Sequence, residues 1–156
     1  MSALSLDQLT SFVLKAKSAT YVGGGAHSPA CRPASQDLQF RDGAFAYLDS
    51  YFGGADFMGE EIVYYADRPV WGENYFGRIL EPARIAPAEA GQAIQASLSQ
   101  MYRSGRFLGG FELATPWGTY HDTNTGDVSS FTGQEWITRD GLRVYELVYH
   151  GGLIRE

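Results

Sequence analysis

Two stretches of the chain decide its fold: Phe57–Ile79, FMGEEIVYYADRPVWGENYFGRI, and Phe131–Leu153, FTGQEWITRDGLRVYELVYHGGL. They align without a gap, and the identical pairs are Phe57 and Phe131, Gly59 and Gly133, Glu61 and Glu135, Val70 and Val144, Tyr75 and Tyr149, and Gly77 and Gly151. Self-similarity of this kind is the sequence signature of a repeated structural unit. The sequence therefore predicts an internal duplication, with repeats at approximately residues 5–80 and 86–154.

A helix is expected before each of these stretches. The first begins after Ser5, because Ser5 and Gln8 fit a capping box and apolar residues recur at helical spacing from Leu6 to Ala16. The second begins at Pro87, a residue favoured in the first turn, and has an apolar stripe from Ala90 to Met101. Each apolar stripe needs a sheet to cover it.

Strands follow from residue alternation and turn chemistry, and the expected ranges are 38–40, 45–51, 57–65, 70–76, 131–138 and 143–149. The Asp-Gly pairs at 42–43 and 140–141 indicate hairpins. The glycine-rich segments 23–36 and 122–130 are expected to be loops. Together these elements predict an α+β fold, in which two tandem helix-plus-antiparallel-strand repeats form one domain, 1–156, with a curved sheet.

Charge and cysteine content exclude several classes of protein. The chain has 12 Lys and Arg against 18 Asp and Glu, a net charge of −6. A nucleic-acid-binding surface needs clustered positive charge, so we expect no direct nucleic-acid binding. Met1–Thr10 has no long apolar run, so we expect neither a signal peptide nor a membrane span. The single cysteine, Cys31, has no partner for an internal disulfide, and these features together indicate a soluble cytoplasmic domain.

The most informative residues are Glu61 and Glu135, which occupy the same position in the two aligned stretches. Period-two alternation places Glu135 on the strand face that carries Phe131, Gly133 and Ile137. Burying a carboxylate without a partner costs several kcal/mol or raises its pKa. We therefore expect each glutamate to have an arginine, tyrosine hydroxyls or a ligand as its partner.

Aromatic and polar side chains gather around these glutamates in the sequence. The candidate ligand-binding residues are Tyr47, Asp49, Tyr51, Trp71, Asn74, Tyr75 and Tyr149. Aromatic walls combined with carboxylates suit an organic cation, through cation–π attraction and charge pairing. The first functional interpretation is therefore a sensor-like domain that binds a small organic, possibly cationic, ligand.

Two other interpretations remain open. In the first, the chain is an isomerase, hydrolase or cyclase, with Glu61 or Glu135 as general acid or base and Asp49, Asp122 or His150 in the complementary role. In the second, both glutamates are satisfied core groups and the repeat builds an interaction surface for a homodimer. The sequence has no cofactor motif and no recognised metal-ligand spacing, so we expect neither group.

Several motif blocks resemble an uncharacterised bacterial domain family: Asp49–Gly54 (DSYFGG), Phe57–Glu61 (FMGEE), Pro69–Gly72 (PVWG), Asn74–Arg78 (NYFGR) and Tyr149–Gly152 (YHGG). Domains of this family often follow a Cro/C1-type helix-turn-helix head in transcriptional regulators, and the resemblance therefore implies an effector sensor. This sequence shows no such head before its first helix. Glu73 stands where the family usually has an apolar residue, which adds a third acidic group.

The expected two-module architecture is also similar to that of gyrase-inhibitor-like ligand-binding domains. Those domains bind lipophilic cations between their two halves and use a buried glutamate. Their motifs do not align with this sequence, so the similarity is one of architecture and transfers no residue role.

Overall fold

The computed structural model describes residues 4–156. The first three residues of the Met1–Thr10 stretch, considered above as a signal peptide, lie outside the described residues. The strands are β1 (His27–Ser28), β2 (Gln36–Asp42), β3 (Phe45–Gly53), β4 (Phe57–Tyr65), β5 (Arg68–Ile79), β6 (Phe111–Thr115), β7 (Gly118–Asp127), β8 (Ser130–Arg139) and β9 (Leu142–Leu153). Every paired strand is antiparallel to its neighbours, and the order is β1-β2-β3-β4-β5-β9-β8-β7-β6.

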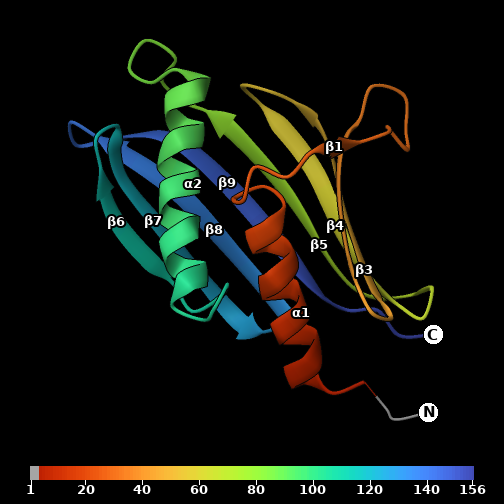
Figure 1. The fold of residues 1–156 in the computed structure, drawn as a ribbon. Coiled ribbons are helices and arrows are strands. Elements are labelled where there is room, and N and C mark those ends of the chain that lie inside the picture. Colours follow the sequence, from red (N-terminus) through yellow and green to blue (C-terminus); the bar gives the residue numbers. More distant parts are fainter. Residues whose placement is uncertain (1–3) are drawn as a thin grey trace.

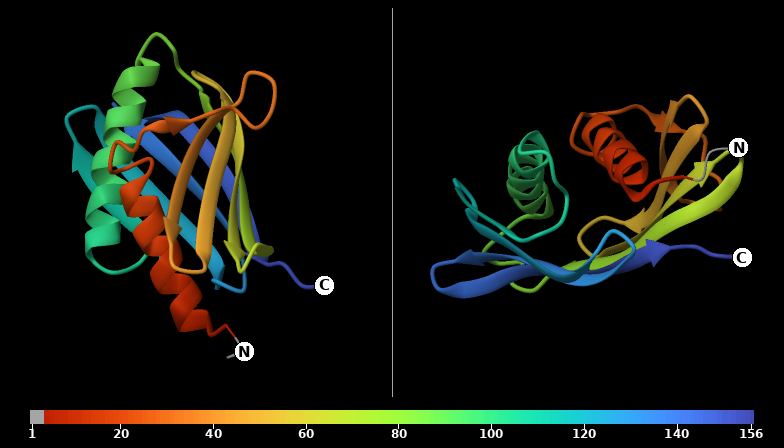
Figure 2. Two further views of the ribbon diagram at one scale, coloured as in Figure 1. Left: turned by 45° about the vertical axis from the view of Figure 1, so that its right-hand side comes forward. Right: turned by 90° about the horizontal axis from the view of Figure 1, so that it is seen from below.

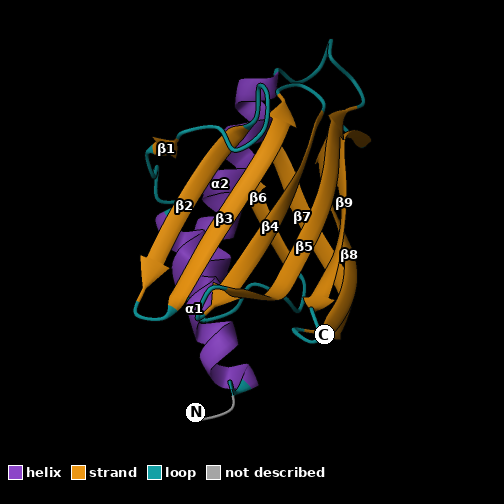
Figure 3. Ribbon diagram, turned by 90° about the vertical axis from the view of Figure 1, so that its right-hand side faces the viewer, coloured by secondary structure: helices purple, strands orange, loops and turns teal. Residues whose placement is uncertain are grey.

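Two helices, α1 (Leu6–Ala19) and α2 (Pro87–Arg103), lie on the same face of this sheet (Figure 1; Figure 3). The expected capping box of α1 is present, because the backbone N–H of Gln8 donates to Ser5 Oγ and that of Ser5 donates to Gln8 Oε1. Helix α1 packs over β2 and β3, whereas α2 packs over β6 and β7. Within the described residues, neither helix is long and apolar enough to cross a membrane.

The sheet curves strongly around the two helices, which lie next to each other in its hollow (Figure 2). The central strands β5 and β9 join the two halves of the sheet by nine consecutive residue pairs, from Trp71–Leu153 to Ile79–Tyr145. The core also crosses this seam, since Trp71 stacks on Phe131 with ring centroids 5.9 Å apart. The indole N–H of Trp71 donates to the carbonyl of Val128 at 2.9 Å.

The expected fold class is therefore wrong. The sequence predicted an α+β fold of two tandem helix-plus-strand repeats, but one continuous nine-stranded antiparallel sheet dominates the structure and the two helices only cover one of its faces. The physical reason is the β5–β9 pairing, because each of these strands would otherwise leave an edge of unpaired backbone groups. Whether the matched stretches arose by duplication stays a prediction.

The expected strands and hairpins are confirmed with small changes at their ends, but the loop expected at 122–130 is wrong. Most of that segment is the second half of β7, and the turn comes only at Asp127–Ser130. Its sequence is polar for a strand because most of its side chains are exposed and Asp122, which is buried, lines the cavity described below. The short strand β6 was not expected either.

The convex face of the sheet, opposite the helices, is largely polar but carries a short apolar row. Met58, Phe76 and Val148 are consecutive cross-strand neighbours there, and each is at least 42% exposed. Homodimer formation stays a prediction, because no partner chain is present in the structure.

Candidate functional site

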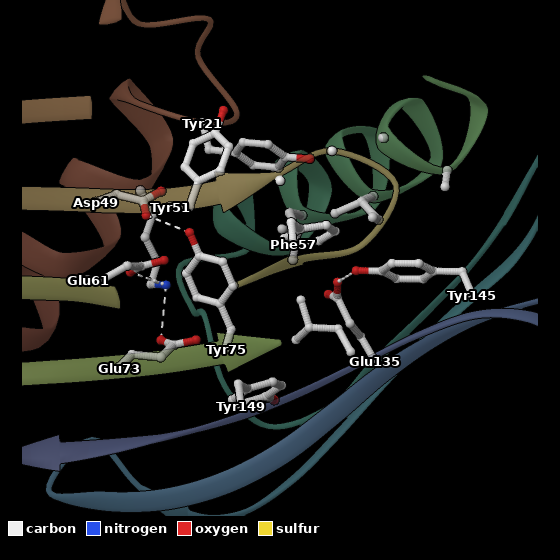
Figure 4. A pocket seen from close by; sticks show the side chains of 18 of the residues that line it. Tyr21, Asp49, Tyr51, Phe57, Glu61, Glu73, Tyr75, Glu135, Tyr145 and Tyr149 are labelled. Atoms are coloured by element: carbon white, nitrogen blue, oxygen red, sulfur yellow. Dashed lines mark hydrogen bonds and ion pairs between the residues drawn. The ribbon is translucent and has the colours of Figure 1, made fainter. Parts of the chain in front are cut away.

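A cavity of about 380 Å³ lies between the concave face of the sheet and the two helices (Figure 4). Its lining comes from α1, α2 and every long strand except β6, and combines tyrosines, carboxylates and aliphatic side chains. The exposed residues of the lining are Gln36 at the start of β2, Gly53, Gly54 and Ala55 in and beside the β3–β4 turn, and Pro87 at the start of α2. The opening therefore lies where this turn faces the first turns of α2.

Three carboxylates form the first acidic group of the cavity. Asp49, Glu61 and Glu73 are directly opposite one another on β3, β4 and β5, and point to the same face. They are 4%, 8% and 9% exposed, respectively. Carboxylates directly opposite each other in a sheet repel, so this row needs positive charge or protons to be stable.

Lys17, on the last turn of α1, supplies positive charge to the first acidic group. Its Nζ lies 2.7 Å from Glu61 Oε2 and 3.1 Å from Glu73 Oε2, and the side chain is 8% exposed. Burial lowers the pKa of Lys17, but Glu61 and Glu73 outweigh burial and hold the pKa well above its usual value. In the described part of the chain, Glu61 Oε2 has this ion pair but no partner with hydrogen-bond geometry.

Two further carboxylates, Asp122 on β7 and Glu135 on β8, are directly opposite each other and form the second acidic group. They are 6% exposed. Glu135 accepts hydrogen bonds from the hydroxyls of Tyr120 at 2.5 Å and Tyr145 at 2.8 Å. Among residues 4–156, the cavity lining contains no lysine or arginine besides Lys17, and the side-chain donors to these two carboxylates are tyrosine hydroxyls.

Tyr75 and Tyr149 form the floor between the two acidic groups, and they face each other across the β5–β9 seam. Tyr75 lies over Gly59 of β4 and donates to Asp49 on β3 at 2.6 Å. Tyr149 lies over Gly133 of β8 and donates to Asp122 on β7 at 2.7 Å. A methyl group on either glycine would come within 2.4 Å of the tyrosine ring or hydroxyl, so glycine is what lets each ring lie flat.

Burial controls the ionisation of these carboxylates. It raises the pKa of Glu135 to about 7, although the hydroxyl of Tyr120 opposes the shift. Burial likewise raises the pKa of Asp122 to about 6, opposed by the Tyr149 hydroxyl. The pKa values of Asp49 and Glu73 are also raised, mainly by burial and also by repulsion from Glu61. The cavity therefore gains negative charge across the neutral pH range.

The structure brings together most of the residues singled out in the sequence. The cavity is lined by Tyr47, Asp49, Tyr51, Glu61, Tyr75, Glu135 and Tyr149, and also by Asp122. Trp71 is instead buried in the core without lining the cavity. Asn74 and His150 are cross-strand neighbours exposed on the convex face, because each alternates with an inward-facing tyrosine. His150 therefore lies away from both glutamates.

Sequence reasoning missed Lys17, Tyr21, Tyr102 and Tyr145 as cavity residues. A signal for Lys17 was available, because it continues the apolar stripe of α1 four residues after Val13 and directly after Ala16. Tyr145 occupies the position of Trp71 when the two repeated stretches are aligned. Of these two side chains, Tyr145 lines the cavity and Trp71 does not. Glu73 was visible only as a departure from the family that the chain resembles.

The residues considered as metal ligands in the sequence do not come together in the structure. Residues 4–156 hold no group of three or more side chains with the geometry of a metal site. His121 and Asp122 are adjacent and therefore point to opposite faces, and His121 stacks on Trp136 with centroids 5.0 Å apart. The cavity combines five carboxylates with one ammonium group.

Comparison with known proteins places this chain in a family. Residues 49–154 match the family described as Domain of unknown function (DUF5680), and the chain therefore belongs to it. The matched segment runs from β3 to β9 and contains all five cavity carboxylates, whereas Lys17 lies before it. No curated protein gives a significant match. No solved structure gives one either.

Proposed function

We propose that this protein binds a small organic cation in the cavity between the helices and the sheet. The observation that carries the proposal is the imbalance of charge: five buried carboxylates face the single ammonium group of Lys17. Burying carboxylates without compensation is costly. A bound cation would compensate them.

The walls support an organic cation over a simple ion. The tyrosine floor and the side chains of Phe57, Ile94 and Leu98 offer apolar and aromatic surface next to the carboxylates. Aromatic faces attract ammonium groups and bury the hydrocarbon attached to them. A cavity of about 380 Å³ is also in the size range of small-molecule sites.

A thermal-shift screen tests the proposal. The panel contains aliphatic amines, aromatic amines and quaternary ammonium compounds, each with a neutral analogue of the same shape, at a pH where the carboxylates are ionised. We expect cations but not their analogues to raise the melting temperature. Glu61→Gln should remove the shift, while Glu60→Gln, which changes the exposed neighbour on the opposite face of β4, should keep it. A panel without any cation-specific shift would reject the proposal.

A second candidate function is general acid–base catalysis on the bound molecule. It is favoured by Glu135, whose pKa of about 7 suits proton transfer near neutrality. Mass spectrometry of each screened ligand after incubation separates the two functions. Conversion that is lost in Glu135→Gln would support catalysis, whereas unchanged ligand would leave binding alone.

The proposal includes a sensor-like role, supported by the resemblance to domains that follow Cro/C1-type helix-turn-helix heads. A sensor must respond to its ligand, and here both helices and the sheet line the same cavity. Ligand binding is therefore positioned to change the packing of α1 and α2. A regulator gene next to the gene for this chain would favour the role, and a biosynthetic cluster would favour an enzyme.

A further inference from the structure

We infer that the ligand is a dication, with an amine at each end of an apolar chain, such as an alkane diamine. This inference rests on the proposed function and specifies its ligand class. It comes from the division of the carboxylates into two groups, Asp49, Glu61 and Glu73 in the first and Asp122 and Glu135 in the second.

The two groups occupy different rows of the sheet. A row is a line of residues that pair directly across neighbouring strands. The first acidic group belongs to the row that contains Glu73 of β5. The second belongs to the row that contains Gly77 of β5, because Gly77 pairs with Leu147 of β9 and Leu147 pairs with Glu135 of β8. The rows are thus four residues apart along the strand, or about 13 Å at the usual rise per residue. Figure 4 shows Glu61 and Glu73 on one side of Tyr75 and Glu135 on the other. A single ammonium group contacts carboxylates only at about 3 Å and cannot serve both groups.

Each acidic group has carboxylate oxygens that one ammonium group of a ligand can pair with. In the first, three carboxylates share Lys17, and Glu61 Oε2 is buried without a hydrogen bond. In the second, the two carboxylates have only tyrosine donors. Two cations act on Asp122 through space. Lys17 is already paired with Glu61 and Glu73, and the guanidinium of Arg106 is committed to the carbonyls of Leu108 and Gly110.

The space between the two groups is lined by side chains that suit a hydrocarbon chain. The rings of Tyr75 and Tyr149, whose hydroxyls are already bonded to Asp49 and Asp122, form the sheet side. Ile94 and Leu98 of α2 line the cavity on the helix side. Burying each methylene group there contributes about 0.8 kcal/mol. A polar linker would leave its own groups without partners against these walls.

Isothermal titration of the whole chain with matched amines tests the inference. The series runs through putrescine, hexanediamine, octanediamine, decanediamine and dodecanediamine, each compared with the monoamine of equal carbon number. Once one ammonium is bound, the second binds intramolecularly, so we expect the best diamine to bind at least about tenfold tighter than its monoamine. Affinity should peak at an intermediate length and fall on both sides.

Variants locate the second amine. Asp122→Asn should remove most of the advantage of the best diamine over its monoamine. Glu112→Gln, an exposed change on neighbouring β6, should leave that advantage in place. The inference is overturned if diamines and monoamines bind equally tightly. It is also overturned if Asp122→Asn leaves the advantage of the diamine over its monoamine intact. In either case the proposed cation site stands. If no amine of either kind binds, both the inference and the cation site are rejected.

Discussion

At the scale of single residues, the two lysines of the chain have opposite environments. Lys15 is mostly exposed and pairs with Asp42 at the surface, whereas Lys17 is buried against Glu61 and Glu73. An exposed ion pair contributes little to stability, because water screens it and the side chains lose entropy. Removing one member of a buried ion pair is costly, because it leaves uncompensated charge.

We expect Lys17→Met to lower the free energy of unfolding by about 3–5 kcal/mol at neutral pH, because Glu61 and Glu73 lose their ammonium partner. The loss should shrink as the pH falls, because burial raises the pKa of Glu73 and this carboxylate then takes up a proton. Lys15→Met is the matched control and should cost less than about 1 kcal/mol. Urea denaturation at two pH values measures both effects, and equal losses in the two variants would contradict the assignment.

Glu135 makes the stability of the fold depend on pH. Folding raises its pKa from the ordinary 4.5 to about 7, so the folded state holds the proton more tightly than the unfolded chain. The resulting stabilisation is complete below pH 4.5 and is lost as the pH rises through 7, a change of about 3 kcal/mol. Glu135→Gln should remove this part of the pH dependence. A variant whose unfolding free energy falls as steeply as the wild type between pH 4.5 and 8 would contradict it.

At the scale of elements, a glycine on one strand positions a tyrosine from the next. Tyr149 crosses Gly133 to reach Asp122, and Tyr75 crosses Gly59 to reach Asp49. The tyrosine floor therefore depends on residues that have no side chain of their own.

We expect Gly133→Ala to destabilise the fold by about 1–3 kcal/mol, since its methyl group would lie 2.2 Å from Tyr149 Cζ and displace the ring from Asp122. Gly54→Ala is the control, because nothing lies within 4 Å of its added methyl group. Thermal unfolding of both variants checks this. Similar melting temperatures would show that Tyr149 moves aside at no cost.

Elements were also the scale at which sequence reasoning worked best. Alternation placed Glu61 and Glu135 on the inner face correctly, because the strands carrying them have no register change before Val63 and Ile137. Alternation failed to predict the second half of β7. There the inner residue Asp122 is as polar as the outer residues, so no apolar–polar alternation marks the strand. Lys17 was overlooked because a lysine is rarely buried unless it is paired, and its partners lie on β4 and β5.

At the scale of the whole molecule, the β5–β9 seam unites the two halves. Local patterns describe each strand but carry no information about which edge strands join. The sequence therefore predicted two tandem helix-plus-strand repeats, whereas one continuous nine-stranded sheet dominates the fold. The same seam brings the second acidic group into the cavity that holds the first. The similarity to gyrase-inhibitor-like domains relied on two modules and therefore does not support the proposed function.

Because core contacts cross the seam, we expect the chain to unfold in a single cooperative transition. Calorimetry should give a calorimetric enthalpy equal to the van't Hoff enthalpy. Two resolved transitions would show that the halves fold independently and would contradict this description of the fold.

The most direct test of the cation site is a calorimetric titration with phenethylamine and with its neutral counterpart phenethyl alcohol, at pH 5.5 and pH 8. Burial raises the pKa of Asp122 to about 6 and that of Glu135 to about 7, so both ionise between these pH values. Phenethylamine should therefore bind more tightly at pH 8, and the alcohol should show no such change. Equal binding of amine and alcohol at both pH values, or no binding of either, would contradict the account.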